Sequence, residues 1–280
     1  MNNNKIKISI ITPFFNSKKL LINHFNQSKK FTSCLPIELI YIDDNSKDGS
    51  YEFIKKKIKG YRKIKLFKLK KNYGPGIARN IGIKKSKGEY LIFLDADDTL
   101  IFNAIKKLIK KIQNKTKNNL IFFNYIKNNS NQANLSKLKF KKNTLIKKFL
   151  RTELDMGPNF YLYNRKFLNK NKIFFKKGFY EDILFILKVF TIMKTFTKFK
   201  FKLYKKNNIK NSISNTYSLK HLSDFNKSCL DKYNFFLVNI LGKVKNVSIQ
   251  DLQYGLRGDY VFSQKLLKNC KHSIKKKNMI

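Results

Sequence analysis

Three carboxylates follow an apolar segment in the first half of the chain. Residues 90–94 read Tyr-Leu-Ile-Phe-Leu, and Asp95, Asp97 and Asp98 come directly after them. Oxygen ligands suit hard divalent ions such as Mg²⁺ and Mn²⁺, which often complete their coordination shell with water and phosphate oxygens. The pattern therefore predicts a metal-bound nucleotide at the end of a buried strand. A solvated acidic turn that caps the next helix is the alternative for this motif taken alone.

Three further apolar segments of strand length come before it. They cover residues 7–12, 38–42 and 63–68, and helix-like segments near residues 18–30, 51–59 and 77–86 lie between the four strands. This alternation is typical of a parallel sheet covered by helices. In such sheets ligands bind beyond the carboxyl ends of the strands. The polar residues that follow the strands should therefore meet at one edge: Asn16, Asp43, Asp44, Asp95 and Asp97.

A glycine-containing segment, residues 72–82, lies between the third and fourth strands. Pro75 suits the first turn of a helix, and Gly74 allows a close backbone approach. A helix N-terminus offers N–H groups and partial positive charge to an anion, and Arg79, about one turn further on, could add a bidentate phosphate contact. An ordinary surface helix with a Gly-Pro entry is the alternative.

Together these motifs resemble the family 2 glycosyltransferases, inverting enzymes that move a sugar from a nucleotide diphosphate donor to an acceptor hydroxyl. The resemblance rests on residues 10–16, 42–50, 72–82 and 93–98, and it covers about the first 125 residues closely. It implies a GT-A type fold of the α/β class, which is Rossmann-like with a mostly parallel central sheet and flanking helices. A C-terminal helical segment is expected to follow this fold.

The resemblance also implies roles for single residues. Pro13 and Phe15 would form the wall of the base site, and Asp43 would accept the N3–H of uracil, which favours a uridine donor. Asp95 would hold the ribose and Asp97 would bind the divalent metal, Mn²⁺ or Mg²⁺. Asp98 would orient the loop or reach the metal through water, and Asp44 would either cap the turn at residues 45–50 or contact the donor. The other implied donor-binding residues are Asn16, Asn72, Gly74, Arg79 and Ala96.

The resemblance reappears at residues 178–182, where Glu181 and Asp182 are similar to the Glu-Asp pair that begins an acceptor-side helix in the family. Asp182 is the expected catalytic base, with Glu181 beside it. The alternative is that the pair only counters the helix dipole. Two departures from the family stand out: Ile183 replaces a frequent aromatic residue, and the lysines of segment 204–214 replace a His or Arg that can help to bind metal or diphosphate.

Composition adds a large positive charge. The chain has 280 residues, a formal net charge of +44 and no Trp. Such a charge favours binding to nucleic acid or to an anionic membrane, but Lys, Asn, Ile and Phe are all encoded by A/T-rich codons, so genome composition also accounts for it. Basic segments at residues 137–148 and 265–277 could lie on anionic lipid, and an ordinary amphipathic connector is the alternative. No apolar run reaches the ~20 residues of a membrane span. The expected location is therefore either cytoplasmic or peripheral at the inner face of the cytoplasmic membrane.

The sequence thus predicts a catalytic domain over residues 1–217, with a nucleotide-sugar half (1–125) and an acceptor half (126–217), followed by a basic helical extension (218–280). The expected donor is a UDP-hexose or UDP-N-acetylhexosamine, and the expected acceptor is a surface glycan or lipid-linked saccharide. A sugar-phosphate nucleotidyltransferase is disfavoured because no Gly-rich phosphate loop follows the first strand. A non-catalytic nucleic-acid- or membrane-binding protein would leave the acidic strand ends unexplained, and nucleic acid is an unlikely partner because no binding module is recognisable.

Overall fold

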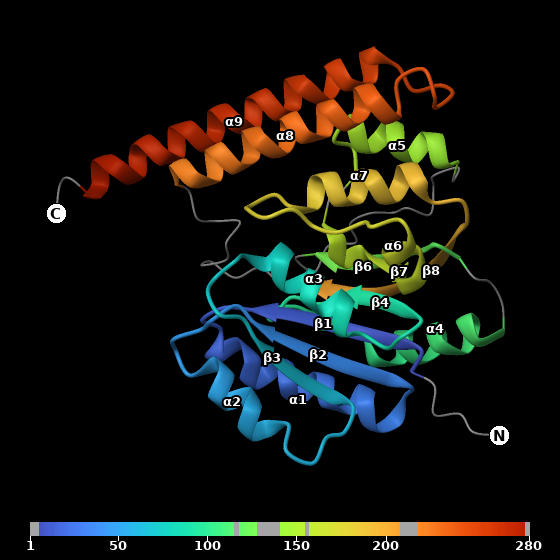
Figure 1. The fold of residues 1–280 in the computed structure, drawn as a ribbon, viewed down its shortest axis with the longest axis vertical. Helices are drawn as coiled ribbons and strands as arrows, with labels where there is room; N and C mark the ends of the chain where they lie inside the picture. Colours follow the sequence, from blue (N-terminus) through green and yellow to red (C-terminus); the bar gives the residue numbers. More distant parts are fainter. Residues whose placement is uncertain (1–5, 115–117, 128–140, 155–156, 208–217, 278–280) are drawn as a thin grey trace. The chain divides into compact units, whose positions relative to one another are not determined.

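The computed structural model describes residues 6–114, 118–127, 141–154, 157–207 and 218–277. They belong to two compact units (Figure 1). Unit 1 takes its residues from 1–137, 158–177 and 193–208, and unit 2 takes its residues from 138–157, 178–192 and 209–280. The chain therefore contributes to each unit in several separate segments.

Unit 1 is built on a sheet of eight strands among the described residues, in the order β3-β2-β1-β4-β7-β6-β8-β5. Strands β1 to β4 pair in parallel, β7 runs antiparallel to both β4 and β6, β8 runs parallel to β6, and β5 runs antiparallel to β8. The strands are β1 (Ile8–Phe14), β2 (Ile37–Asp43), β3 (Ile64–Lys68), β4 (Tyr90–Phe93), β5 (Thr99–Leu100), β6 (Leu120–Lys127), β7 (Tyr161–Asn164) and β8 (Phe196–Lys206).

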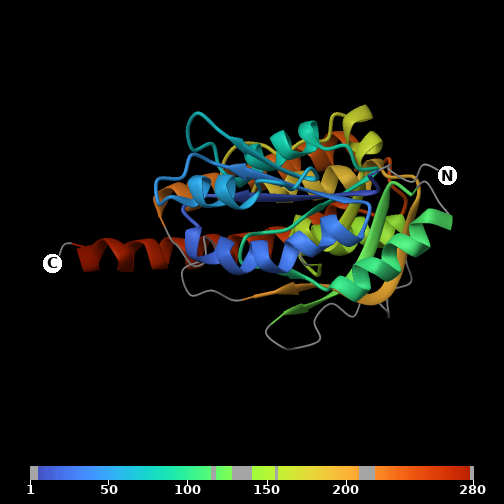
Figure 2. The same ribbon diagram turned by 90° about the horizontal axis from the view of Figure 1, so that it is seen from below.

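Helices cover both faces of the parallel strands. Every residue of β1, β2 and β4 is buried, as expected for continuous apolar strands between helical layers. Figure 2 shows α1 and α3 on opposite faces of these strands. At Gly82 of α3 an added Cβ would lie 2.3 Å from Ile11 Cγ2, so the lack of a side chain lets α3 approach β1 closely. The helices of unit 1 are α1 (Lys18–Cys34), α2 (Ser50–Lys57), α3 (Pro75–Lys85), α4 (Phe102–Asn114), the 3₁₀ helix η2 (Pro158–Phe160) and α6 (Arg165–Lys170).

Unit 2 is helical. It contains α5 (Lys142–Leu150), α7 (Asp182–Ile192), α8 (Leu219–Asn239) and α9 (Ile249–Lys277). Helix α7 is buried along most of its length because it is apolar on nearly all sides. Gly255 brings α9 against α5, since an added Cβ would lie 1.9 Å from the Leu150 carbonyl oxygen. None of the helices described is both long and apolar enough to span a bilayer.

The predicted architecture is confirmed: an α/β unit with a mostly parallel sheet and flanking helices, together with C-terminal helices. The predicted strands and helices of the first 100 residues begin and end within a few residues of the observed ones. The helical extension predicted over residues 218–280 contains two helices, α8 and α9, among its described residues. Most of segment 204–214 lies outside the described residues.

Candidate active site

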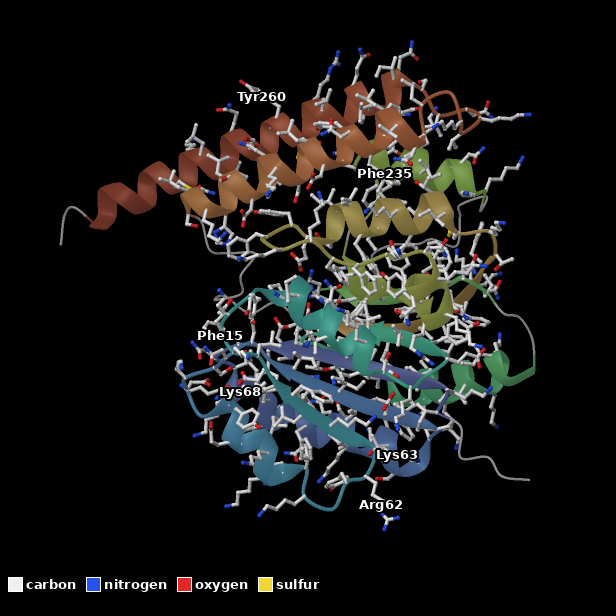
Figure 3. All side chains as sticks on the ribbon, in the orientation of Figure 1. Phe15, Arg62, Lys63, Lys68, Phe235 and Tyr260 are labelled. Carbon is white, nitrogen blue, oxygen red and sulfur yellow. The ribbon has the colours of Figure 1, made fainter. Side chains whose placement is uncertain are left out.

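The carboxyl ends of β1, β2 and β4 lie next to one another. Strand β1 pairs in parallel with β2 on one side and with β4 on the other, and Phe14 is in register with Asp43. The residues that follow these strands therefore emerge at one edge of the sheet, as predicted. Figure 3 shows Phe15 and Lys68, near the ends of β1 and β3, on the side of unit 1 opposite to Arg62 and Lys63.

Asp43, the last residue of β2, keeps one carboxylate oxygen without a partner. Its side chain is fully buried, and Oδ1 accepts a hydrogen bond of 2.9 Å from the Ser46 backbone N–H. Among the described residues Oδ2 has no hydrogen-bond partner. A buried acceptor that is left unsatisfied costs free energy, so a ligand N–H that reached this oxygen would be favoured. Asp43 can thus recognise a donor group on a ligand.

Asp44 has a different arrangement, because both its oxygens bind backbone. Oδ1 accepts the Tyr73 N–H at 2.8 Å and Oδ2 accepts the Gly74 N–H at 2.7 Å. Burial raises the pKa of Asp44 above its ordinary value, although these two hydrogen bonds act in the opposite direction. The carboxylate therefore fixes the loop before α3. The turn at residues 45–50 is held by Asp43 and Asp48, so capping of this turn, one of the two roles considered for Asp44, belongs to them.

Gly74 and Asn72 form the entry to α3. Gly74 has φ of +91°, a conformation that favours glycine, and its N–H is used by Asp44 and, at 3.2 Å, by Asn72 Oδ1. The Gly74 N–H is therefore engaged within the protein, although the sequence predicted it as a donor contact.

Asn16 joins the loops after β1 and β2. Its Oδ1 accepts the Lys47 N–H at 2.8 Å, and its own N–H donates to Ser46 Oγ at 2.9 Å. The residue has φ of +47°, a left-handed conformation that Asn tolerates better than most residues. Of the two residues expected to form the base wall, Pro13 is buried within β1 and Phe15 is 42% exposed. Phe15 is thus the one with a ring surface available to stack on a ligand.

Asp95 is held on both sides of its carboxylate. Oδ1 pairs with the Arg79 guanidinium at 2.9 Å, and Oδ2 accepts a hydrogen bond of 2.7 Å from Asn159 Nδ2. Burial favours the neutral acid, but Arg79, Asn159 and Lys206 outweigh it and lower the pKa of Asp95. Asp95 is therefore ionised at neutral pH. Arg79 is itself buried, beside the rings of Phe93 and Phe175, and in this structure it binds Asp95, whereas the sequence predicted a phosphate contact.

Asp97 and Asp98 complete an acidic cluster with Asp95. One ligand oxygen from each of the three carboxylates lies within 4.8 Å of the others. Burial and the charge of Asp95 raise the pKa of Asp97 to about 6. Burial, Asp95 and Asp97 together raise the pKa of Asp98 to about 7. The intervening Ala96 is buried.

The donor set fits a hard divalent cation. All three side chains offer oxygen, which Mg²⁺ and Mn²⁺ prefer, and burial together with repulsion between the neighbouring carboxylates raises the pKa of Asp97 and of Asp98. A bound cation would relieve that repulsion. Asp98 contributes less freely than Asp97, because Tyr204 Oη and the Asn207 N–H already bind its two oxygens.

Three residues near the cluster were not predicted from the sequence. Asn159 on η2 binds Asp95, Tyr204 on β8 binds Asp98, and Asn207 Nδ2 donates to the Asp97 carbonyl at 2.7 Å. Each comes from a segment far away along the chain. The sequence offered one signal, the similarity of segment 204–214 to the segment that closes the domain in family members. Nothing comparable pointed to Asn159.

Glu181 and Asp182 lie in unit 2, at the start of α7. Asp182 is the first residue of the helix and is half-buried, and Glu181 before it is buried. A carboxylate in the first turn is favoured by the partial positive charge of the helix N-terminus. The predicted helix start is therefore confirmed, whereas the catalytic role of the pair stays a prediction.

Helix α8 anchors the segment that leads into this pair. The Phe179 N–H donates to Asp224 Oδ2 at 3.0 Å, the Tyr180 carbonyl accepts from Ser228 Oγ at 3.0 Å, and the Phe179 ring stacks on His221 at 3.8 Å between centroids. Tyr180 has φ of +59°, a strained value for a residue with a large side chain. These contacts hold that conformation, so α8 determines how the chain enters α7.

The chain belongs to glycosyl transferase family 2, whose family model matches residues 9–175. The matched segment includes the residues that follow β1 and β2 and the acidic cluster of Asp95, Asp97 and Asp98.

Among curated proteins, an uncharacterized glycosyltransferase of Haemophilus influenzae is 43% identical over 119 residues, which is 41% of this chain and 44% of that protein. The poly(ribitol-phosphate) beta-N-acetylglucosaminyltransferase TarP of Staphylococcus aureus is 42% identical over 108 residues, covering 36% and 32%. A cholesterol galactosyltransferase of Borreliella burgdorferi is 30% identical over 210 residues, covering 66% and 56%. The chain therefore spans only about a third to just over half the length of these relatives.

Solved structures show the same fold. Staphylococcus aureus TarS in complex with UDP-GlcNAc matches with a TM-score of 0.70 and 21% identity, over 92% of this chain and 74% of that one. A mannosyltransferase from Pyrobaculum calidifontis in complex with GDP-Man and Mn²⁺ matches with a TM-score of 0.58 and 11% identity, over 90% and 73%. At these identities the likeness concerns the fold alone.

Proposed function

We propose that this protein is an inverting, metal-dependent glycosyltransferase that uses a UDP-sugar. The observation that carries the proposal is the pair of features at one sheet edge: the unpartnered oxygen of buried Asp43 and the acidic cluster of Asp95, Asp97 and Asp98. Both lie inside the segment that matches the family model. They follow β2 and β4, the two strands that flank β1, and this order suits a ligand with a base at one end and phosphates at the other.

The base would be uracil. Its N3–H is a donor, which matches the free acceptor Oδ2 of Asp43, whereas the N3 of neutral cytosine has no hydrogen to donate. Phe15 would stack on the base. Since Asp43 is fully buried, the loops around it must open slightly when the base enters. The UDP and UDP-GlcNAc bound to TarS support this choice of nucleotide by analogy.

From the base at β2, the ribose and the diphosphate of the donor would extend toward the end of β4. Asp95, kept ionised by Arg79 and Asn159, would accept hydrogen bonds from the ribose hydroxyls. Asp97 would be the principal carboxylate ligand of Mn²⁺ or Mg²⁺, since both Asp98 oxygens are already hydrogen-bonded. Such a cation, when bound, supplies positive charge to the diphosphate leaving group. Arg79 would act through Asp95 and would not touch phosphate.

Asp182 would serve as the general base. It would take the proton of the acceptor hydroxyl while that oxygen forms a bond to the anomeric carbon. The bond between this carbon and the diphosphate oxygen would break at the same time, so that UDP leaves with the electron pair and the configuration inverts. General-base catalysis of this kind typically contributes about 10²–10⁴-fold.

The acceptor would be a surface polysaccharide or a lipid-linked saccharide at the inner face of the cytoplasmic membrane. Relatives whose names specify poly(ribitol-phosphate) or an undecaprenol-linked saccharide support this class of acceptor.

The experiment is UDP release by the purified chain across a panel of UDP-sugars, with Mn²⁺ or with chelator. We expect slow metal-dependent release from one donor, and loss of that release in Asp97→Ala. Asp182→Asn should retain donor binding but lose transfer once an acceptor is found. Release that is equal with chelator and in Asp97→Ala, or no release from any UDP-sugar, would contradict the proposal.

A further inference from the structure

One side of α8 is apolar and exposed. Leu219, Leu230 and Leu237 are 61%, 62% and 49% exposed. Their separations are close to whole numbers of helical turns, so they share one side of the helix. The opposite side carries buried residues such as Phe225, Cys229 and Phe236, which face the rest of unit 2. The exposed leucines are therefore not part of the core of this unit.

Helix α9 has a similar exposed side. Ile249, Leu256, Tyr260 and Val261 are between 41% and 67% exposed. Figure 3 shows Tyr260 on the side of α9 that faces away from α8. The buried residues Asp251, Leu252, Asp259 and Leu266 recur on the other side of the helix, where Asp259 binds Lys232 and Tyr233 of α8. Exposed apolar side chains that gather on one side of a helix often mark an interaction site, and here both C-terminal helices carry them.

The charge on this surface has a single sign. Between residues 218 and 270 no Asp or Glu is exposed, because Asp251 and Asp259 are buried in ion pairs and the other two are half-buried. The same segment exposes basic side chains beside the apolar ones, including Lys227, Arg257, Lys265 and Lys268. The surface thus combines apolar residues with uncompensated positive charge.

We propose that this α8–α9 surface docks on an anionic lipid bilayer. Apolar side chains would enter the boundary between headgroups and acyl chains, and the basic side chains would bind lipid phosphates. Two other partners fit less well. A nucleic acid would leave the leucines exposed to water, and a second copy of the chain would bring two positively charged surfaces together. The proposal goes beyond the proposed transfer reaction and does not depend on it.

The test is co-sedimentation of the full-length chain with vesicles of phosphatidylcholine, with and without phosphatidylglycerol. We expect binding to the phosphatidylglycerol vesicles only. The double variant Leu256→Ser/Tyr260→Ser should weaken that binding by roughly tenfold or more, because two side chains would no longer bury apolar area. Lys265→Gln/Lys268→Gln should weaken it and reduce its salt dependence.

Matched controls lie in unit 1. Ile22→Ser removes an apolar side chain of 43% exposure from α1, and Lys56→Gln/Lys57→Gln removes two exposed charges from α2. Both should bind vesicles like the wild type. Equal losses in the control and α9 variants would show a general charge effect and overturn the proposal. Light scattering that shows a dimer dispersed by Leu256→Ser/Tyr260→Ser, with no vesicle binding, would assign the surface to a second copy. Vesicle binding needs no sugar nucleotide, so its result is independent of the UDP-release assay.

Discussion

Asp43 and Asp44 are neighbours with the same side chain but with different hydrogen bonds. Both oxygens of Asp44 accept backbone N–H groups of the loop before α3, whereas Asp43 keeps one oxygen unpartnered among the described residues. The sequence left the role of Asp44 open between a turn cap and a donor contact. In the structure Asp44 holds the loop before α3, a contact that the sequence did not indicate, and the recognition of a ligand by Asp43 stays a proposal.

Replacing Asp43 by Asn should change base preference. Asn Nδ2 can donate to the N3 of cytosine, and the charge-assisted bond to uracil is lost, which is worth about 1.5–3 kcal/mol. We expect UDP affinity to fall by about tenfold or more and CDP affinity to rise, measured by isothermal titration calorimetry. Glu52→Gln, an exposed change on α2, is the control. Unchanged UDP affinity in Asp43→Asn would refute the uracil assignment.

Asn159 can be tested by a change of charge at nearly constant shape. In Asn159→Asp, a second carboxylate would face Asp95 Oδ2, where the wild-type amide donates a hydrogen bond. The repulsion should displace Asp95 or raise its pKa, and the affinity for UDP should fall by about tenfold. Binding of UDP to the variant at wild-type affinity would show that Asp95 does not hold the ribose.

Among the elements, the parallel half of the sheet was predictable and the antiparallel half was not. Strands β1, β2 and β4 are continuous apolar runs because helices cover both their faces, and this leaves a clear signal in the sequence. Strand β8 alternates Phe with Lys and pairs with strands far away along the chain, and β5 has only two residues. The contacts of β8, such as that of Tyr204 with Asp98, depend on this distant pairing and could not be derived from a local sequence pattern.

The same reasoning applies to the C-terminal helices. The sequence predicted that they exist, but their contacts with the segment before Asp182 come from side chains about 45 residues further along, such as Asp224 and Ser228. No local pattern specifies such partners. In the structure α8 therefore positions the segment before Asp182, a role that the sequence did not indicate.

Loosening α8 from this segment should affect transfer more than donor binding. Ser228→Ala removes the bond to the Tyr180 carbonyl, so the strained φ of +59° loses a support. We expect kcat for transfer to fall by about tenfold, with KM for the UDP-sugar nearly unchanged, because the donor residues lie in unit 1. Ser228→Thr, which keeps the hydroxyl, should restore the rate. An equal loss in Ser228→Thr, or a change in KM alone, would exclude this positioning role.

Part of the positive charge of the molecule packs against aromatic rings. Several lysines lie over aromatic rings, for example Lys68 over Tyr51 at 4.7 Å and Lys111 over Phe199 at 5.1 Å. An excess of Lys, Phe and Tyr therefore provides cation–π contacts on the surface of unit 1. These contacts are compatible with a compositional origin of the charge, and the α8–α9 surface is where a specific partner is proposed.

Stability should fall in mild acid because of one buried histidine. Burial lowers the pKa of His24 to about 4, against the opposing charge of Asp95, and its ring contacts Tyr41. The unfolded chain takes up this proton near pH 6.5 and the folded chain only near pH 4. The stabilisation is thus complete above about pH 6.5 and is lost as the pH falls toward 4, by about 3 kcal/mol in total.

This effect can be separated from other titrating groups by comparing the wild type with His24→Met in urea denaturation between pH 4 and 7. Met is flexible enough to fill the site. The free energy of unfolding of the wild type should drop more steeply with falling pH than that of the variant. Identical slopes would show that the pKa of His24 is the same in the folded and the unfolded chain, and would contradict this effect.

The dependence of UDP affinity on Mn²⁺, measured by calorimetry for the wild type and Asp97→Ala, tests the metal–diphosphate site most directly. We expect the wild type to bind UDP at least tenfold more tightly with Mn²⁺ than with chelator, and Asp97→Ala to bind equally weakly in both. If the wild type binds UDP with the same affinity with and without Mn²⁺, or if Asp97→Ala keeps the full Mn²⁺ effect, the acidic cluster does not form a metal–diphosphate site.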